Sequence, residues 1–206
     1  MAIPIDREEL PEKFRKLDQS FLKHLEGEDT SSFISFPTNT TFLGKENDEN
    51  VILVIRSHWM RYFKYIASAV LVLILPTVVA LFIPTLNTNA MLLISIFLTS
   101  ILLSMSFAIY SFLMWYYNVN IITDKRVIDL DFKSIFSHTS SEARLEKIED
   151  VTSQQSGSFT NILDIGTVHI QTAGTNAFIE FDNIPKPREV QDILSDLLEL
   201  ANKGEI

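Results

Sequence analysis

One stretch of the chain, residues 65–123, contains no Asp, Glu, Lys or Arg, although charged residues make up 21% of the sequence. A helix needs roughly 20 apolar residues to cross a hydrocarbon core of about 30 Å. Residues 65–83 and 91–115 are two apolar runs of this length, and the polar residues 84–90 connect them. The pattern therefore predicts a transmembrane helical hairpin over residues 65–117. The alternative is that these two runs form core helices of a soluble domain. Such helices would need other helices to cover them, and the rest of the chain is too short and too polar to supply that cover.

Basic and aromatic residues flank both ends of this hairpin. Basic residues within about 15–20 residues of a span tend to stay on the cytoplasmic side, and aromatic rings settle at the membrane interface. Because the connection 84–90 carries no charge, we predict a multi-pass protein of the cytoplasmic membrane with both termini in the cytoplasm. The predicted membrane-interface residues are Arg56, Trp59, Arg61, Tyr62, Lys64, Trp115, Tyr116, Tyr117, Lys125 and Arg126.

Apolar residues also recur at helical spacing near the N-terminus, at Leu10, Phe14, Leu17, Phe21 and Leu25. This spacing predicts an amphipathic helix over residues 6–26, followed by a Ser/Thr-rich linker that completes an N-terminal region of residues 1–45. The stripe could pack on the C-terminal domain, pair with a second copy of the chain, or lie on the membrane. Its polar face mixes both charges and lacks the cationic bias of a membrane-surface helix, so we predict that these five residues contact protein.

Short β-rich runs separated by turn residues fill the C-terminal domain, residues 118–206, which follows the hairpin. Strands are predicted at residues 118–122, 126–132, 137–144, 150–155, 166–172 and 177–181. A final helix is predicted to begin near Pro187 and to end before Gly204. This order favours a closed, curved sheet with one end plugged by the helix, because closure removes exposed strand edges. Residues 46–64, before the hairpin, are predicted to form a juxtamembrane segment with basic and aromatic residues.

Several motifs of the C-terminal domain resemble a known family. The segments YNVNIITDKRVIDLDF, SSEARLEKIEDVTSQQS, IGTVHIQTAG and NIPKPREVQDIL look like the bacterial pleckstrin-homology (PH)-like domain of membrane-flanked proteins, and ENDENVILVIRSHWM resembles the stretch before the hairpin in such proteins. The resemblance extends over residues 46–201, with one departure at residues 131–134, where the usual Gly is missing. It implies an α+β membrane protein in which the hairpin precedes a split β-barrel capped by a C-terminal α-helix. It implies no activity, because the family has no known catalytic motif and a fold does not determine a function.

The composition argues against several kinds of chemistry. There is no Cys, which excludes disulfides, thiolate metal sites and thiol nucleophiles. No Gly-rich phosphate loop is present, and His24, His58, His138 and His169 lack metal-ligand spacing. The apolar spans carry no ionisable residue, whereas transporters and proton paths usually do. We therefore predict a protein that is not an enzyme and has no catalytic residue, cofactor, metal or small-molecule substrate.

The charge of the C-terminal domain bears on its partners. Residues 118–206 contain eight Lys/Arg and fifteen Asp/Glu, a formal charge of −7. Nucleic acids and inositol phosphates bind basic patches, so neither is an expected partner. We predict a membrane-anchored binding or scaffold module that binds protein or assembles with copies of itself. Lipid-headgroup recognition at the membrane surface is the alternative, and an accessory subunit of an enzyme or transporter is a third interpretation.

Overall fold

The chain folds as two compact units. The computed structural model describes residues 14, 32–37, 42, 44–83, 88–134, 137–173 and 178–204. One unit, which we call the β unit, comprises residues 1–58 and 117–206, and the other, the hairpin unit, comprises residues 59–116. The hairpin unit is therefore an insertion in the sequence of the β unit.

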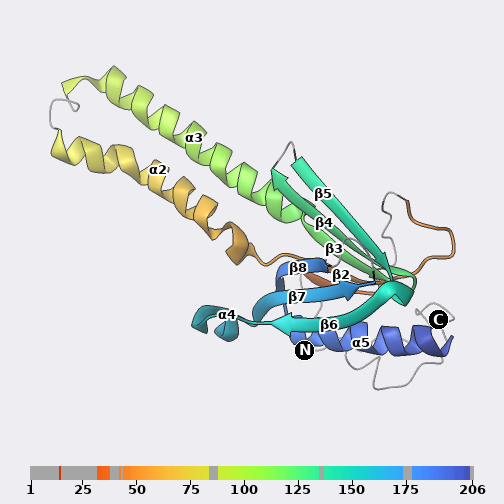
Figure 1. Cartoon of the computed structure of the whole chain (residues 1–206). Coiled ribbons are helices and arrows are strands. Elements are labelled where there is room, and N and C mark those ends of the chain that lie inside the picture. The colour runs from red at the N-terminus through yellow and green to blue at the C-terminus, as the bar shows by residue number, and fades with distance from the viewer. Residues whose placement is uncertain are drawn as a thin grey trace. The chain divides into compact units, whose positions relative to one another are not determined.

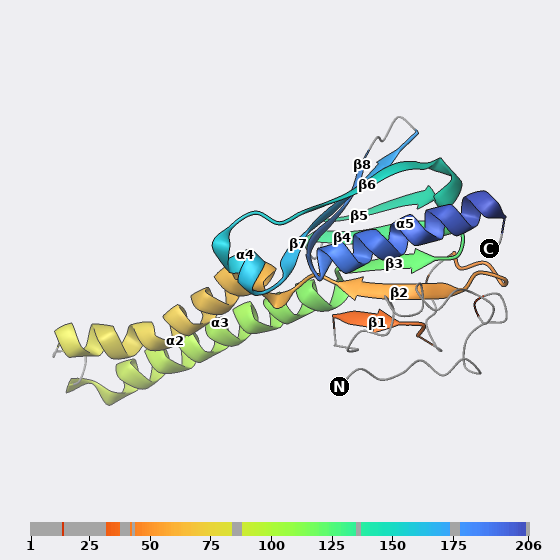
Figure 2. The same cartoon turned by 90° about the horizontal axis from the view of Figure 1, so that it is seen from below.

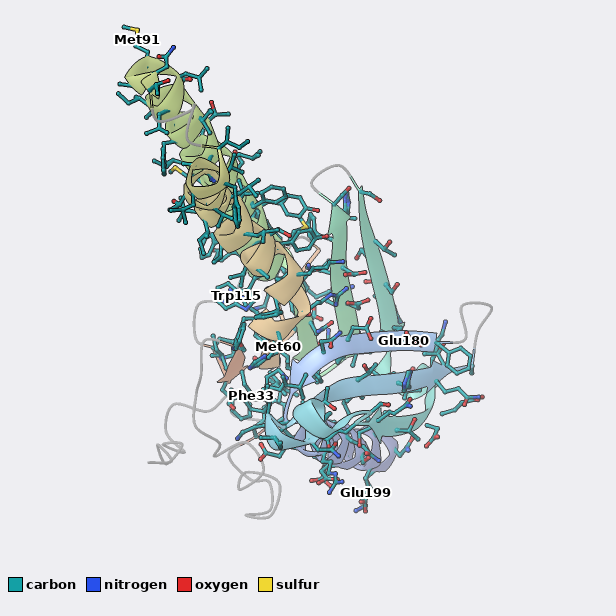
Figure 3. All side chains as sticks on the ribbon, turned by 90° about the vertical axis from the view of Figure 1, so that its left-hand side faces the viewer. Phe33, Met60, Met91, Trp115, Glu180 and Glu199 are labelled. Carbon is teal, nitrogen blue, oxygen red and sulfur yellow. The ribbon has the colours of Figure 1, made fainter. Side chains whose placement is uncertain are left out.

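The hairpin unit consists of a short 3-10 helix, η1 (Trp59–Tyr62), and two long helices, α2 (Phe63–Phe82) and α3 (Ala90–Tyr117). The helices predicted for residues 65–83 and 91–115 are present, with ends shifted by at most two residues. Both are long and apolar enough to cross a membrane by length and composition. Their side chains point outward along the whole length, from Met60 and Trp115 to Met91 (Figure 3).

Several hydroxyl groups in the two helices donate to backbone carbonyls. Ser104 Oγ donates to the carbonyl of Ala69 on the neighbouring helix at 2.9 Å. Ser68, Thr99 and Ser106 donate to carbonyls of their own helices, at 2.7, 2.8 and 2.9 Å. A hydroxyl that donates to the preceding turn of its own helix leaves no unsatisfied donor on the surface. The outer faces of the two helices are therefore apolar.

The described strands of the β unit form two antiparallel sheets. The larger sheet has the order β1-β2-β3-β4-β5, with β1 (Phe33–Ser35), β2 (Val51–Arg56), β3 (Val119–Thr123), β4 (Arg126–Ser134) and β5 (Ser137–Arg144). The smaller sheet has the order β6-β7-β8, with β6 (Ile148–Gln154), β7 (Ile165–Thr172) and β8 (Phe178–Pro185). The remaining elements are η3 (Leu145–Lys147), α4 (Ser158–Ile162) and α5 (Pro187–Lys203). All six strands predicted for the C-terminal domain, and its final helix, are thus present.

The core of the β unit lies between these sheets and α5. Helix α5 packs on β6, β7 and η3 (Figures 1 and 2). Its apolar stripe, Val190, Ile193, Leu194 and Leu197, is fully buried. These side chains join one cluster with buried residues of both sheets, so the helix is an integral part of the core.

The prediction of a closed barrel is wrong. Among the described residues, no strand pairing joins the two sheets, which leaves β1, β5, β6 and β8 as edges. The chain turns at η3 from the larger sheet into the smaller one, and the apolar residues of α5 complete the core between them. Strand β5 exposes mostly polar side chains, and a polar edge discourages pairing with other chains.

The strands give the β unit two distinct ends. Arg56, the last residue of β2, pairs with Val119, the first residue of β3, so the chain leaves for the hairpin unit and returns from it at adjacent points. Ser57 Oγ donates to the carbonyl of Asp182 at 3.1 Å, and the N–H of His58 donates to that of Asn183 at 2.7 Å. We call this the hairpin end. The β3–β4 turn, η3 and the C-terminal part of α5 lie together at the other end, the turn end.

Strand β2 is a difference from the sequence prediction, which assigns residues 46–64 to a juxtamembrane segment. Its sequence, VILVIR, is apolar without alternation, and five of its six residues are buried. A continuous apolar run of this kind is typical of a strand covered on both faces. The run could therefore have been recognised as a strand, but its pairing with β3 across the inserted hairpin could not.

Candidate interaction site

Most of the predicted interface aromatics lie at one end of the hairpin unit. Trp59 packs edge-on against Phe63, with ring centroids 6.4 Å apart, and Tyr62 OH donates to the carbonyl of Met114 at 3.1 Å. Trp59, Tyr62 and Trp115 line one groove of about 460 Å³ between the helices. Figure 3 shows Met60 and Trp115 at this end and Met91 at the other. The two aromatic sets are thus brought together, as the hairpin prediction requires.

Two predicted interface residues belong to the hairpin end of the β unit, Arg56 and Tyr117. The Tyr117 ring lies 5.5 Å from that of Phe132, which in turn stacks on His138 at 5.4 Å. The side chain of Asn118 bonds both the N–H and the carbonyl of Phe132. These contacts fix the chain where it re-enters the sheet from α3.

Lys125 and Arg126 lie at the turn end and have acidic partners there. Arg126 Nε donates to Glu49 Oε1 at 2.9 Å, and a terminal nitrogen donates to Glu49 Oε2 at 3.0 Å. The other terminal nitrogen donates to Glu142 at 3.0 Å. Lys125 Nζ lies 2.7 Å from Glu46 and 2.8 Å from Asp48. We call this cluster the clasp: Glu46, Asp48, Glu49, Lys125, Arg126 and Glu142.

Electrostatics keep the central pair of the clasp charged. Burial acts to raise the pKa of Glu49, but hydrogen bonds from Arg126, the Glu46 backbone and Thr123 outweigh it and hold that pKa below its usual value. The hydrogen bond to Glu49 raises the pKa of Arg126. Because the folded-state pKa of Glu49 is lowered, its contribution to stability is complete at neutral pH and is lost as acid titrates the folded carboxylate.

Lys125 and Arg126, as members of the clasp, lie at the opposite end of the β unit from Arg56 and Tyr117. The five residues of β3 lie between the hairpin end and the clasp, a distance of about 16 Å at roughly 3.3 Å per residue. The structure therefore does not bring Lys125 and Arg126 together with Arg56 and Tyr117. Their acidic partners at residues 46–49 are distant in sequence, which is why charge counting near the spans grouped them with the interface.

A pocket of about 640 Å³ opens at the turn end. Charged side chains of both signs line it, among them Glu142, Arg144, Glu146 and Lys147. In the part of the chain that the structure describes, no group of three or more His, Asp or Glu residues could hold a metal ion.

The N-terminal region contributes to the β unit. Phe14 is fully buried in its core, with its ring 5.5 Å from that of Phe36. Strand β1 pairs with the edge of β2, and Phe33 is also buried. Of the three partners considered for the apolar stripe, Phe14 thus contacts the β unit of its own chain. The predicted helix 6–26 otherwise lies outside the described residues, together with Leu10, Leu17, Phe21 and Leu25.

Comparison with protein families connects this architecture to known proteins. The profile of the family described as "Bacterial PH domain" matches residues 65–198, more than half of the chain. The chain belongs to the bacterial PH domain family. The resemblance drawn from the sequence is confirmed for the PH-like domain, and the β unit is hereafter the PH-like unit. The match begins after β2, so β1 and β2 extend this unit beyond the matched residues.

No curated protein matches the chain. Among solved structures, the crystal structure of a DUF1696 family protein with a pleckstrin-homology domain from Shewanella loihica PV-4 matches with 12% identity and a TM-score of 0.32, over 39% of this chain and 70% of that one. Families with PH-like domains are generally non-enzymatic modules that bind proteins or lipids.

Proposed function

We propose that this protein is a non-enzymatic, membrane-anchored binding module. In this proposal the hairpin unit crosses the cytoplasmic membrane twice, and the PH-like unit contacts protein on the cytoplasmic side, either a different protein or a second copy of the chain. The observation that carries the proposal is the insertion of two long apolar helices between β2 and β3, which are hydrogen-bonded neighbours in the sheet.

Exposure of the helices supports the membrane anchor. Only Ala69 and Pro76 of α2, and Ser100, Ser111 and Met114 of α3, are buried. Soluble proteins rarely expose contiguous apolar surface of this extent, and a bilayer would cover it. Arg61 in η1 and Lys64 at the start of α2, with the uncharged connection at the other end of the hairpin, favour a cytoplasmic location for both termini.

The two connections to the hairpin are short. Only Ser57 and His58 separate β2 from η1, and only Asn118 separates α3 from β3. A domain on one long flexible linker explores a large volume, whereas two short connections from adjacent strands restrict the PH-like unit closely. A partner bound to this unit would therefore be held at the membrane surface.

Charge favours protein over lipid headgroups as the partner. Residues 118–206 carry a formal charge of −7, and the clasp engages Lys125 and Arg126 with carboxylates. An anionic headgroup would have to compete with these carboxylates. We therefore assign both residues to the clasp and propose the following membrane-interface set: Arg56, Trp59, Arg61, Tyr62, Lys64, Trp115, Tyr116 and Tyr117.

Two measurements test the binding role: crosslinking in native membranes, and the mass of the purified full-length protein in nanodiscs. We expect a complex larger than one chain. Phe14 packs in the core of its own chain, and we propose that Leu17 and Phe21 contact the partner, so a Leu17→Ser, Phe21→Ser variant should weaken the complex. A Lys16→Ser, Lys23→Ser variant, which changes the polar face of the same segment, is the matched control and should keep the complex. A protein that stays monomeric at every concentration and yields no crosslinked species would contradict the proposal.

A further inference from the structure

Two large apolar side chains project from the PH-like unit at α4. Ile162 is 79% exposed and Leu163 is 40% exposed. Among the described residues of this unit, the other exposed large apolar side chains are Tyr117 and Phe178. Most other large apolar side chains of this unit belong to two buried clusters, so the exposed pair at α4 is an exception that the fold itself does not require.

Hydrogen bonds place this pair at the hairpin end. Strand β7 begins at Ile165, which pairs with Pro185 at the end of β8, and the N–H of Lys186 donates to the carbonyl of Asp164 at 2.8 Å. The preceding residues of β8, Asp182 and Asn183, bond Ser57 and His58. Within the PH-like unit, α4 therefore lies at the end from which the chain leaves for the hairpin. In Figure 2 it is near the start of α5, away from the C-terminal end of that helix.

Local bonds hold the α4 loop in a defined shape. Gln155 Nε2 donates to Asp164 Oδ1 at 2.8 Å across the base of the loop, and Thr160 Oγ1 donates to the carbonyl of Gly157 at 2.7 Å. Asp164 is the only charged residue between Gln155 and Ile165. The loop thus presents apolar side chains with one acidic group, which is itself hydrogen-bonded, and offers little repulsion to an anionic membrane.

We propose that Ile162 and Leu163 insert into the boundary between lipid headgroups and acyl chains, as a membrane contact additional to the two helices. This inference rests on the proposed function, because the hairpin is what brings a bilayer to this end of the PH-like unit. Apolar side chains on a short amphipathic segment bind at that depth by removing their surface from water.

The extra contact has a mechanical consequence. The two chain connections leave from neighbouring strands, which lie only about 4.8 Å apart, and two such close points allow the PH-like unit to rock about the line that joins them. A third contact at α4, away from that line, stops the rocking and sets the tilt of the unit against the membrane.

Fluorescence with depth-dependent quenching tests the insertion. The sequence contains no Cys. An Ile162→Cys variant of the full-length protein can therefore be labelled at one site with an environment-sensitive dye. In vesicles of phosphatidylethanolamine and phosphatidylglycerol, we expect brominated acyl chains to quench this label severalfold more than a label at Glu199→Cys. Glu199 lies on the exposed face of α5, toward the turn end.

A third label separates this inference from the proposed function. Leu102, which is exposed in the middle of α3, carries the dye in a Leu102→Cys variant. Quenching at Leu102 and none at Ile162 would overturn the insertion while leaving the anchor intact. Absence of quenching at both sites would contradict the anchor itself. Equal quenching at Ile162 and Glu199 would also overturn the insertion, because contact would then not be specific to α4.

Discussion

Replacement of Arg126 with Met is expected to destabilise the PH-like unit by about 3–5 kcal/mol, the usual cost of leaving one buried charge of an ion pair without its partner. The Glu49 side chain is 0% exposed and loses both bonds to the guanidinium. The hydroxyl of Thr123 and the N–H of Glu46 remain as its donors, which is insufficient for a buried carboxylate. Pulse proteolysis of the full-length protein in detergent at neutral pH measures the loss.

Two further variants serve as controls for Arg126→Met. Lys125→Met removes the neighbouring ion pairs, but these are exposed and screened by solvent, so a much smaller loss is expected. Adding Glu49→Gln to Arg126→Met should recover part of the stability, because the buried charge is then absent. If Arg126→Met were no more harmful than Lys125→Met, the clasp would not stabilise the unit as described.

Replacement of Gly166 with Ala is expected to cost about 1–3 kcal/mol or more through overpacking. A Cβ at this position would lie 2.5 Å from the carbonyl oxygen of Gln154, 2.8 Å from Pro187 Cγ and 2.9 Å from Gln155 Cγ. The first atom is backbone of β6 and the second is the rigid ring at the start of α5, so neither neighbour can move away easily. The smaller sheet and the helix must separate to admit the methyl group.

Gly204→Ala is the matched control for Gly166→Ala. Gly204 ends α5 with a φ of +70°, and nothing lies within 4 Å of a Cβ added there. Its replacement therefore carries only the backbone cost of a left-handed residue, roughly 1 kcal/mol. The same proteolysis measures the loss of stability in both variants. Equal losses would show that the close contacts around Gly166 do not determine the cost of adding a methyl group there.

Local pattern was sufficient to predict most of the secondary structure. Turn residues such as Ser156-Gly157-Ser158 separate some of the six strands after the hairpin, and residues 137–144 coincide with β5. The final helix follows its apolar stripe from Pro187 to the residue before Gly204. Closure of the sheet was predicted wrongly because it depends on how the two sheets and α5 pack around one core, and short-range patterns do not contain that information.

The sites show the same division between local and long-range information. Trp59, Tyr62 and Trp115 could be placed at one end of the hairpin from helix geometry alone. The partners of Arg126 could not, since Glu49 is 77 residues away in the sequence. The exposure of Ile162 and Leu163 could not be predicted either. Apolar residues between two strands are usually expected in the core, and only the position of the loop in the fold shows that these two are exposed.

The most direct test of the membrane anchor is the accessibility of single cysteines in intact cells. Thr88→Cys places a thiol in the connection between α2 and α3, and Ser140→Cys places one on exposed β5. We predict that a membrane-impermeant maleimide labels Thr88→Cys in intact spheroplasts and labels Ser140→Cys only after permeabilisation. Labelling of Ser140→Cys in intact spheroplasts, or of neither site before permeabilisation, would contradict a hairpin that crosses the membrane twice with the PH-like unit in the cytoplasm.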